Sequence, residues 1–374
     1  MKPAWIMRMA WIMGPAWLGL AWMASSATAA GFEVETVGPG VHAFVRIKPP
    51  GMLLDSNVVA IVNDDDVVVV DANLTPSSAE ATIAALRKLT PKPVSVLVNT
   101  HRHADHTGGN AVYLREFPGV EIVGSAAMAE DLAAQGEETL QGWIGWANQL
   151  AADLPKALDS GTSLGGRQLT AELRASYEGD LGAVREIVED ASRMKVIAPT
   201  TTLAGPEARL VLHRKRSGQD RAIEILALGR GHTRGDLVVW LPAEKILVSG
   251  DLVVTPVPLV GADQSYVDDW TKTLDRVLAL IAVDGTITVP GHGPVLRDPS
   301  AIVRYRDFLS AVAKHTHAAI ERGDTAEKAV ESLDVETFRQ QMAGDDKVLN
   351  FLFATWGRTP AVEAVYREAT SVKR

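Results

Sequence analysis

The segment NTHRHADHTGGN, residues 99–110, places three of the chain's nine histidines and one aspartate within six consecutive residues. Side chains two residues apart on an extended segment point to the same side, so His101 and His103 form one pair of donors. Asp105 and His106 form a second pair, where the chain turns towards the next helix. Imidazole together with carboxylate suits zinc, and also iron or manganese. The spacing therefore predicts a metal site.

Three later segments supply further residues of the same chemical type. His232 lies in the glycine-rich segment GRGHTRGD, Asp251 ends LVSGD, and His292 is enclosed by glycine and proline in VPGHGP. Each follows or ends a short apolar run that reads as a strand. Loops at the carboxyl ends of strands are where α/β folds place their chemistry. The common placement predicts one shared site instead of four unrelated loops.

The elements that would position these residues follow from hydrophobic periodicity. Between residues 31 and 73, the β-branched runs VHAFVRI, NVVAIVN and DDVVVVDAN are separated by turn residues and predict strands. Residues 76–89 carry apolar side chains at helical spacing, and VSVLVN then forms a buried strand that leads into the histidine cluster. Strand-like runs resume over 209–251, and a helix over 266–281 and the strand TITVP follow. The two halves therefore share an order of strands, helix and strand.

Two long segments have a different, helical character. Residues 126–198 are polar and mostly helical, and predict an insertion within one domain instead of a separate domain. The end of the chain is also helical. We therefore divide the chain into residues 1–30, a domain over 31–298 with the insertion at about 126–198, and a helical extension over 299–374 packed on the same domain.

The first thirty residues read as a secretory signal peptide. Lys2 and Arg8 precede an apolar stretch from about Met9 to Met23, and Ala27–Thr28–Ala29 forms an A-x-A cleavage signal. A membrane anchor is the alternative, but the apolar stretch is short and interrupted by Gly14 and Pro15. We expect an exported, periplasmic or secreted protein without a stable membrane anchor after cleavage.

Composition narrows the classes of partner. The formal net charge is −9 for the whole chain, and removal of Lys2 and Arg8 makes it more negative. Nucleic-acid binding needs a basic footprint, so the charge favours a small-molecule substrate. The chain contains no cysteine, which excludes disulfides and thiolate metal ligands.

The order H-x-H-x-D-H, G-H-T-x-G-D, a strand-terminal aspartate and a G-H-G loop resembles the metallo-β-lactamase superfamily. The resemblance covers residues 31–297 and implies an α/β fold, the αββα four-layer sandwich, with two metals at the sheet edges. It implies that one metal binds His101, His103 and His232, that the other binds Asp105, His106 and His292, and that Asp251 bridges the two. Asp71, which ends VVVVD, would support the ligands without binding metal.

This set is most similar to the dinuclear hydrolases of the glyoxalase II type. It implies an exported hydrolase with two zinc ions, or iron or manganese, in which a metal-bridging hydroxide attacks an ester, thioester, lactone or lactam carbonyl. Asp105 would be the catalytic side chain that orients the nucleophile and passes a proton to the leaving group. The acidic bridge at Asp251 distinguishes the chain from most β-lactamases of this superfamily.

Two other functions compete with this interpretation. Persulfide dioxygenases resemble the same superfamily and use a single iron, but they usually lack a complete second set of ligands. A non-catalytic metal-binding component is the other alternative, and the complete ligand set argues against it. Among hydrolases, a phosphoesterase or sulfatase acting on small exported substrates is also compatible with these residues.

Several other residues have two interpretations each. Trp143 and Trp146 either pack onto the core, which we prefer, or form a lid over the metals. Tyr266 and Trp270 read mainly as helix packing, with a pocket wall as the alternative, and Arg234 is either solvated or faces an anionic substrate. The four remaining histidines, which we expect to bind no metal, are His42, His213, His315 and His317. We expect His315 and His317 to be solvated surface residues.

Overall fold

A seven-stranded sheet forms one half of the structure. The computed structural model describes residues 31–46, 55–164, 166 and 168–371, and the proposed signal peptide lies outside these residues. The strands lie side by side in chain order, antiparallel from β1 to β4 and parallel from β4 to β7. They are β1 (Phe32–Gly38), β2 (Val41–Arg46), β3 (Val58–Val62), β4 (Val67–Val70), β5 (Val94–Val98), β6 (Glu121–Ser125) and β7 (Thr201–Leu203).

A five-stranded sheet forms the other half, in the order β12-β11-β10-β9-β8. β11 and β12 are parallel, and the other neighbouring pairs are antiparallel. The strands are β8 (Arg209–Arg216), β9 (Gln219–Leu226), β10 (Val238–Leu241), β11 (Ile246–Val254) and β12 (Ile287–His292). The strand-like runs predicted in this half are all present.

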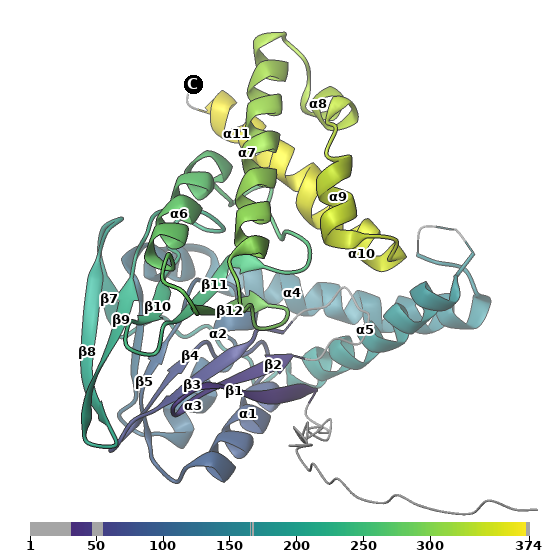
Figure 1. Ribbon diagram of the computed structural model, residues 1–374. Helices are drawn as coiled ribbons and strands as arrows, with labels where there is room; N and C mark the ends of the chain where they lie inside the picture. The colour runs from purple at the N-terminus through teal and green to yellow at the C-terminus, as the bar shows by residue number, and fades with distance from the viewer. Residues whose placement is uncertain (1–30, 47–54, 165, 167, 372–374) are drawn as a thin grey trace, which may run out of the picture.

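The two sheets pack face to face through branched aliphatic side chains. Val59, Ile61 and Val98 of the first sheet share one buried cluster with Ile225 and Val239 of the second. Both sheets therefore bury one face against the other and the opposite face against helices, which explains why strands such as VVVV carry no polar alternation. This is the αββα sandwich that the sequence predicted (Figure 1).

Helices cover the outer face of each sheet. On the first sheet, α1 (Pro76–Leu89) and α3 (Asn110–Glu116) bury Ile83 and Val112 against the strands. α1 has the predicted bounds, because Pro76 follows the N-cap Thr75, whose side chain accepts a hydrogen bond from the amide of Ser78. On the second sheet, α6 (Val267–Leu280) and α7 (Ser300–Glu321) form the outer layer.

Two helical additions flank this frame. The insertion consists of α4 (Ala126–Ser160) and α5 (Ala171–Asp190), which pack against each other around Leu154 and Val184. The C-terminal helices share the buried cluster of α6 and α7 (Figure 1): α8 (Ala326–Ser332), α9 (Glu336–Ala343), α10 (Lys347–Leu352), the π-helical turn η1 (Phe353–Arg358) and α11 (Thr359–Ser371). In the part of the chain that the structure describes, no helix combines the length and the apolar character needed to cross a bilayer.

Candidate metal centre

The histidine cluster begins where β5 ends. The chain bends over residues 100–102, His103 has an extended backbone, and the one-turn helix α2 (Ala104–Thr107) then carries Asp105 and His106. Asn99 fixes this turn, because its side-chain amide donates to the carbonyl oxygen of His106 at 3.0 Å and to Oδ1 of Asn110 at 3.1 Å. The two predicted sets of donors are present, but residues 100–102 form a bend, so the expected extended segment carrying His101 and His103 is wrong.

The other three residues come from the second sheet. His232 lies in the loop between β9 and β10, Asp251 lies within β11, and His292 is the last residue of β12. The expectation that Asp251 ends its strand is wrong, because β11 continues to Val254. Glycine is required beside them: a Cβ atom on Gly291 would lie 1.9 Å from Oδ1 of Asp251. The G-H-G sequence therefore reflects the close approach of β12 to the Asp251 carboxylate.

We define the first group as His101, His103, His232 and the Oδ2 atom of Asp251. Nδ1 of His103 lies 3.0 Å from Nε2 of His101 and 2.9 Å from Nε2 of His232. Oδ2 of Asp251 lies 4.0 Å from Nε2 of His101 and 3.4 Å from Nε2 of His232. Three imidazole nitrogens and one carboxylate oxygen therefore converge on one point.

We define the second group as Asp105, His106, His292 and the Oδ1 atom of Asp251. Oδ2 of Asp105 lies 3.0 Å from Nε2 of His292 and 3.4 Å from Nε2 of His106. Oδ1 of Asp251 lies 3.3 Å and 3.4 Å from the same two nitrogens. The structure thus brings all seven residues singled out in the sequence into two adjoining groups that share one carboxylate.

The chemistry of these donors fits divalent cations. The Asp251 side chain is 1% exposed, and neither of its oxygens has a hydrogen-bond partner among the described residues. Each oxygen instead lies 3.3–4.0 Å from two imidazole nitrogens, and a buried carboxylate is costly unless it is paired with a cation or binds a metal. Imidazole nitrogens crowded beside it are the ligands that zinc and related ions prefer. Each of the two groups therefore has the composition of a metal-binding site.

Outer hydrogen bonds orient three of the imidazoles. Nδ1 of His106 lies 2.7 Å from Oδ2 of Asp71, which also accepts a hydrogen bond from the Thr100 hydroxyl. Nδ1 of His101 lies 3.1 Å from that hydroxyl, and Nδ1 of His232 lies 3.2 Å from the Leu259 carbonyl oxygen. With Nδ1–H directed outwards, each Nε2 atom faces the centre. Asp71 contacts an imidazole and lies in neither group.

The charge environment differs between the two groups. Burial lowers the pKa of His101 well below its usual range and that of His232 to about 3. Burial acts in the same direction on His106 and His292, but neighbouring carboxylates outweigh it. They raise the pKa of His106 well above its usual range and that of His292 to about 9. Asp105 is paired with these imidazoles, which overcome its burial and hold its pKa well below its usual range.

The centre is most accessible at Asp105 and His103. Asp105 keeps 15% of its side chain exposed and His103 is half-buried, whereas the other five side chains are buried. Asp105 therefore combines contact with the second group and access to solvent.

The structure decides between the two interpretations given above for Arg234, Trp270 and Trp146. Arg234 forms ion pairs with Asp131 and Glu130 of α4, so it is not a free cation. Trp270 is fully buried, and its ring lies 5.5 Å from that of His232. The preferred packing interpretation is wrong for Trp146, which is 43% exposed on α4 and contacts the Trp143 ring at 5.3 Å.

Tyr266, His315 and His317 belong to neither group. Tyr266 stacks under the guanidinium of Arg230, at 4.2 Å. His317 keeps 42% of its side chain exposed and pairs with Asp268 at 2.9 Å. His315 is half-buried and contacts the Ala329 carbonyl oxygen, so both are partly solvated and each also has a protein partner.

One supporting residue had not been singled out in the sequence. Asn57, just before β3, donates from its side-chain amide to the carbonyl oxygens of Pro290 and Gly293 at 2.9 and 2.8 Å. It thereby holds the turn that carries His292. The signal available in the sequence was a polar side chain at the entrance to a fully apolar strand.

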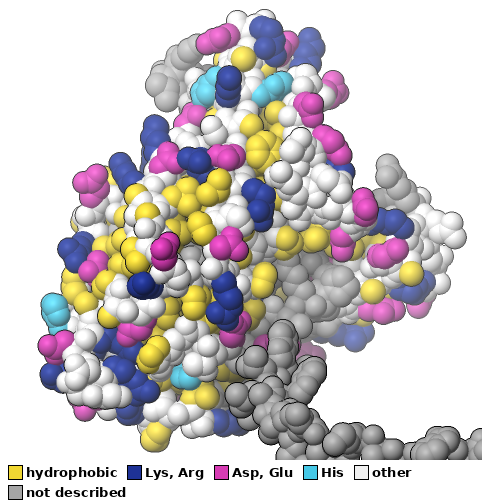
Figure 2. Space-filling view, in the orientation of Figure 1, with side chains coloured by type: hydrophobic (Ala, Val, Ile, Leu, Met, Phe, Trp, Pro, Cys, Tyr) yellow, Lys and Arg dark blue, Asp and Glu magenta, His cyan; other side chains and the backbone are white. Residues whose placement is uncertain are grey.

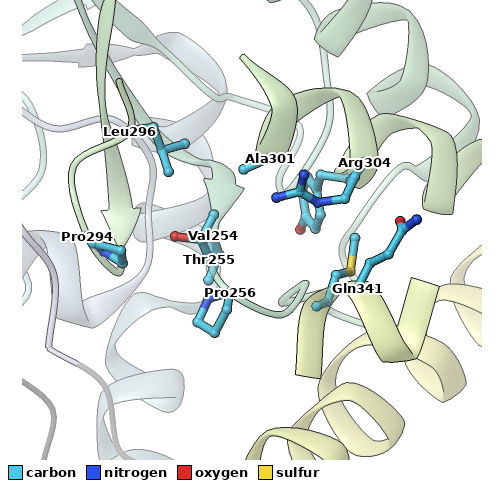
Figure 3. A pocket seen from close by; sticks show the side chains of 10 residues that line it. Val254, Thr255, Pro256, Pro294, Leu296, Ala301, Arg304 and Gln341 are labelled. Carbon is cyan, nitrogen blue, oxygen red and sulfur yellow. The ribbon is translucent and has the colours of Figure 1, made fainter. Parts of the chain in front are cut away.

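A cavity of about 180 Å³ adjoins the second sheet beyond β11 and β12 (Figure 3). Thr255 and Pro294 line it on one side, and Arg304 of α7 and Gln341 of α9 lie on the other. None of the seven metal-type residues contributes to its wall. The cavity is therefore separate from the first and second groups.

Comparison with known proteins identifies the family. The profile of the metallo-beta-lactamase superfamily matches residues 51–292. The chain belongs to this superfamily. A metallo-beta-lactamase type 2 from Bacillus cereus is 36% identical over 75 residues, 20% of this chain and 29% of that protein. A linear primary-alkylsulfatase from Pseudomonas sp. (strain ATCC 19151) is 24% identical over 286 residues, 72% of this chain and 48% of that protein.

One further relative is named for a different reaction, and two solved structures share the fold of this chain. The 2,4-dinitroanisole O-demethylase subunit alpha of Nocardioides sp. (strain JS1661) is 26% identical over 63% of this chain and 51% of that protein. The chain thus spans about half or less of the curated relatives it matches. The match to the structure of a sec-alkyl sulfatase double mutant covers 90% of this chain and 50% of that protein, with a TM-score of 0.59 and 16% identity. The match to a metallo-beta-lactamase from Pontibacter korlensis covers 75% of this chain and 99% of that protein, with a TM-score of 0.51 and 20% identity.

Proposed function

We propose that the protein is an exported dinuclear zinc hydrolase that cleaves an ester, thioester, lactone or lactam of a small molecule. The observation that carries this proposal is the Asp251 carboxylate, whose two oxygens face the two separate groups of donors. A shared carboxylate between two sets of imidazoles favours a pair of cations over one. Membership of a superfamily that includes hydrolases supports the same reaction class.

The residues of the chain have distinct tasks in this reaction. A bound pair of divalent ions supplies a hydroxide at neutral pH and polarises the bond to be cleaved. Asp105, ionised and partly exposed, is placed to orient the nucleophile and to carry a proton to the leaving group. Asp71 holds His106 in the tautomer whose Nε2 lone pair faces the centre.

A sulfuric ester is the second candidate substrate. The match to the linear primary-alkylsulfatase extends over 72% of this chain, whereas that to the Bacillus cereus lactamase extends over 20%. The single-iron oxygenase alternative is weaker, because Asp105, His106 and His292 form a second group as complete as the first.

Surface charge supports a small-molecule substrate instead of a nucleic acid. Lysine and arginine side chains are interspersed with aspartate and glutamate across the face drawn in Figure 2. The chain as a whole has a formal net charge of −9. Both features disfavour a polyanionic partner.

The test combines metal content with turnover. We would measure zinc, iron and manganese in the purified protein by elemental mass spectrometry. The same preparation would be assayed with a panel of lactams, lactones, thioesters and alkyl sulfates. Two zinc ions per chain with hydrolysis would support the proposal and identify the substrate class. One iron per chain, with oxygen uptake on a persulfide and no hydrolysis, would replace it with the oxygenase alternative.

A further inference from the structure

Two arginines project from the two loops that carry the imidazoles of the first group. Arg102 lies between His101 and His103, and Arg234 lies two residues after His232. Both guanidinium groups pair with the same carboxylate of the insertion. Nε of Arg102 lies 3.5 Å from Oδ2 of Asp131, and Arg234 lies 2.8 Å from Oδ1. One side chain of α4 therefore connects the two loops.

The burial of these charges decides which pair matters. Asp131 and Arg102 are 16% and 12% exposed, so their pair is largely shielded from water. Glu130 also pairs with Arg234, at 2.9 Å, but it is 67% exposed. Exposed ion pairs contribute little, whereas removal of one partner from a buried pair leaves an uncompensated charge.

The same network reaches a third loop. The Arg102 guanidinium also donates to Oε1 of Gln264. The neighbouring Ser265 hydroxyl donates to the His232 carbonyl oxygen at 2.9 Å, and the Tyr266 amide donates to that of Gly231 at 2.8 Å. The segment 261–266 therefore contacts both loops of the first group.

We propose that Asp131 is a positioning residue for the first metal position, through which the helical insertion fixes the Arg102 and Arg234 loops. The inference rests on the proposed dinuclear centre and adds the insertion to it. Asp131 acts in two ways. It holds the loops at their observed separation, and it neutralises the Arg102 charge, which otherwise opposes a cation bound beside His103.

The test is zinc binding to metal-free protein, followed by competition with a chelating dye. The His292→Ala variant removes one donor of the second group and leaves the first group complete, so that the tighter binding step can be assigned to the first group. In that background, Asp131→Asn should weaken zinc binding by about tenfold or more, which is the usual cost of losing an outer partner of a ligand. Glu130→Gln, the adjacent and exposed acid, should change it less than about twofold.

A rescue variant separates positioning from general loss of structure. Arg102→Gln combined with Asp131→Asn removes both charges of this pair, and it should recover the part of the affinity that Asp131→Asn alone loses through the unbalanced Arg102 charge. Full-length protein with both groups should show the loss in its first-group step and not in its second. Equal affinity in Asp131→Asn and the parent, or an equal loss in both steps, would overturn the inference. Failure of the unmodified protein to bind two ions would instead overturn the proposed function.

Discussion

The first and second groups share Asp251 but differ in how their imidazoles are held. In the first group three imidazoles meet one carboxylate oxygen, and burial keeps His101 and His232 neutral. In the second group two imidazoles meet two carboxylates, and Nδ1 of His106 also contacts a third carboxylate, that of Asp71, which lies outside the group. The same residue types therefore form one group of neutral donors and one network of paired charges.

This difference has a consequence for how each group takes up a cation. A metal ligand must be deprotonated at the binding atom, so a neutral imidazole binds without losing a proton. In the metal-free protein, His106 and His292 carry protons that balance the acids around them. The first group is thus prepared for a cation at neutral pH, and the second must exchange protons for it.

Removal of the shared carboxylate should have the largest effect. Asp251→Ala takes one donor from each group at once, so we expect loss of dinuclear loading and a fall in zinc affinity of more than about a hundredfold. Elemental analysis and dye competition would measure it. Asp268→Ala, which removes the half-buried acid paired with His317, is the matched control. A variant at Asp251 that kept two ions and full turnover would show that the carboxylate is not shared.

Loss of the outer carboxylate should affect one group more than the other. Asp71→Asn replaces an oxygen that accepts from His106 and Thr100, so the second group should lose about ten- to a hundredfold in zinc affinity. Asp66→Asn is the control, because Asp66 precedes the same strand β4 that Asp71 follows and pairs with Arg214 instead. Comparable losses in both groups would contradict the separation between them.

Proton release should distinguish the two binding steps. Between pH 6 and 8, His101 and His232 are already neutral, so affinity at the first group should hardly change. The raised pKa values of His106 and His292, caused by Asp71, Asp105 and Asp251, mean that these rings are protonated over that range. Affinity at the second group should therefore rise by about tenfold per pH unit for each proton displaced. Zinc titrations in two buffers of different ionisation enthalpy measure the protons released, and equal release in both steps would refute this difference.

Local patterns predicted the elements that depend on local chemistry. Pro76, the N-cap Thr75 and the apolar spacing determine α1, and the predicted helix has its observed bounds. β6 and β7 are short, and they are strands because each pairs with a parallel neighbour from a distant part of the chain. Such pairing leaves no periodicity to detect, so these strands were not predicted individually.

The site shows the same limit. Motif order was sufficient to nominate the seven residues that the structure brings together, because each motif is complete within a few residues. The partners behind them were not predicted, apart from Asp71. Asn57 contacts the His292 turn across 233 residues of sequence, and Asp131 meets Arg234 across 103. These contacts depend on the folded arrangement of the sheets and the insertion, and neither residue belongs to a recognisable motif.

The smallest expected effect concerns Trp270, which the fold places behind the first group. Its Nε1–H donates to the Leu252 carbonyl oxygen at 3.1 Å, and its ring packs against His232. Trp270→Phe keeps an aromatic ring and removes the donor, so we expect about 1 kcal/mol less stability against denaturant and weaker zinc binding at the first group alone. Trp146→Phe makes the same change on an exposed ring and should alter stability by less than about 0.5 kcal/mol. If Trp270→Phe lowered affinity at the second group equally, the two groups would behave as one packed unit, and their difference would lie only in their charges.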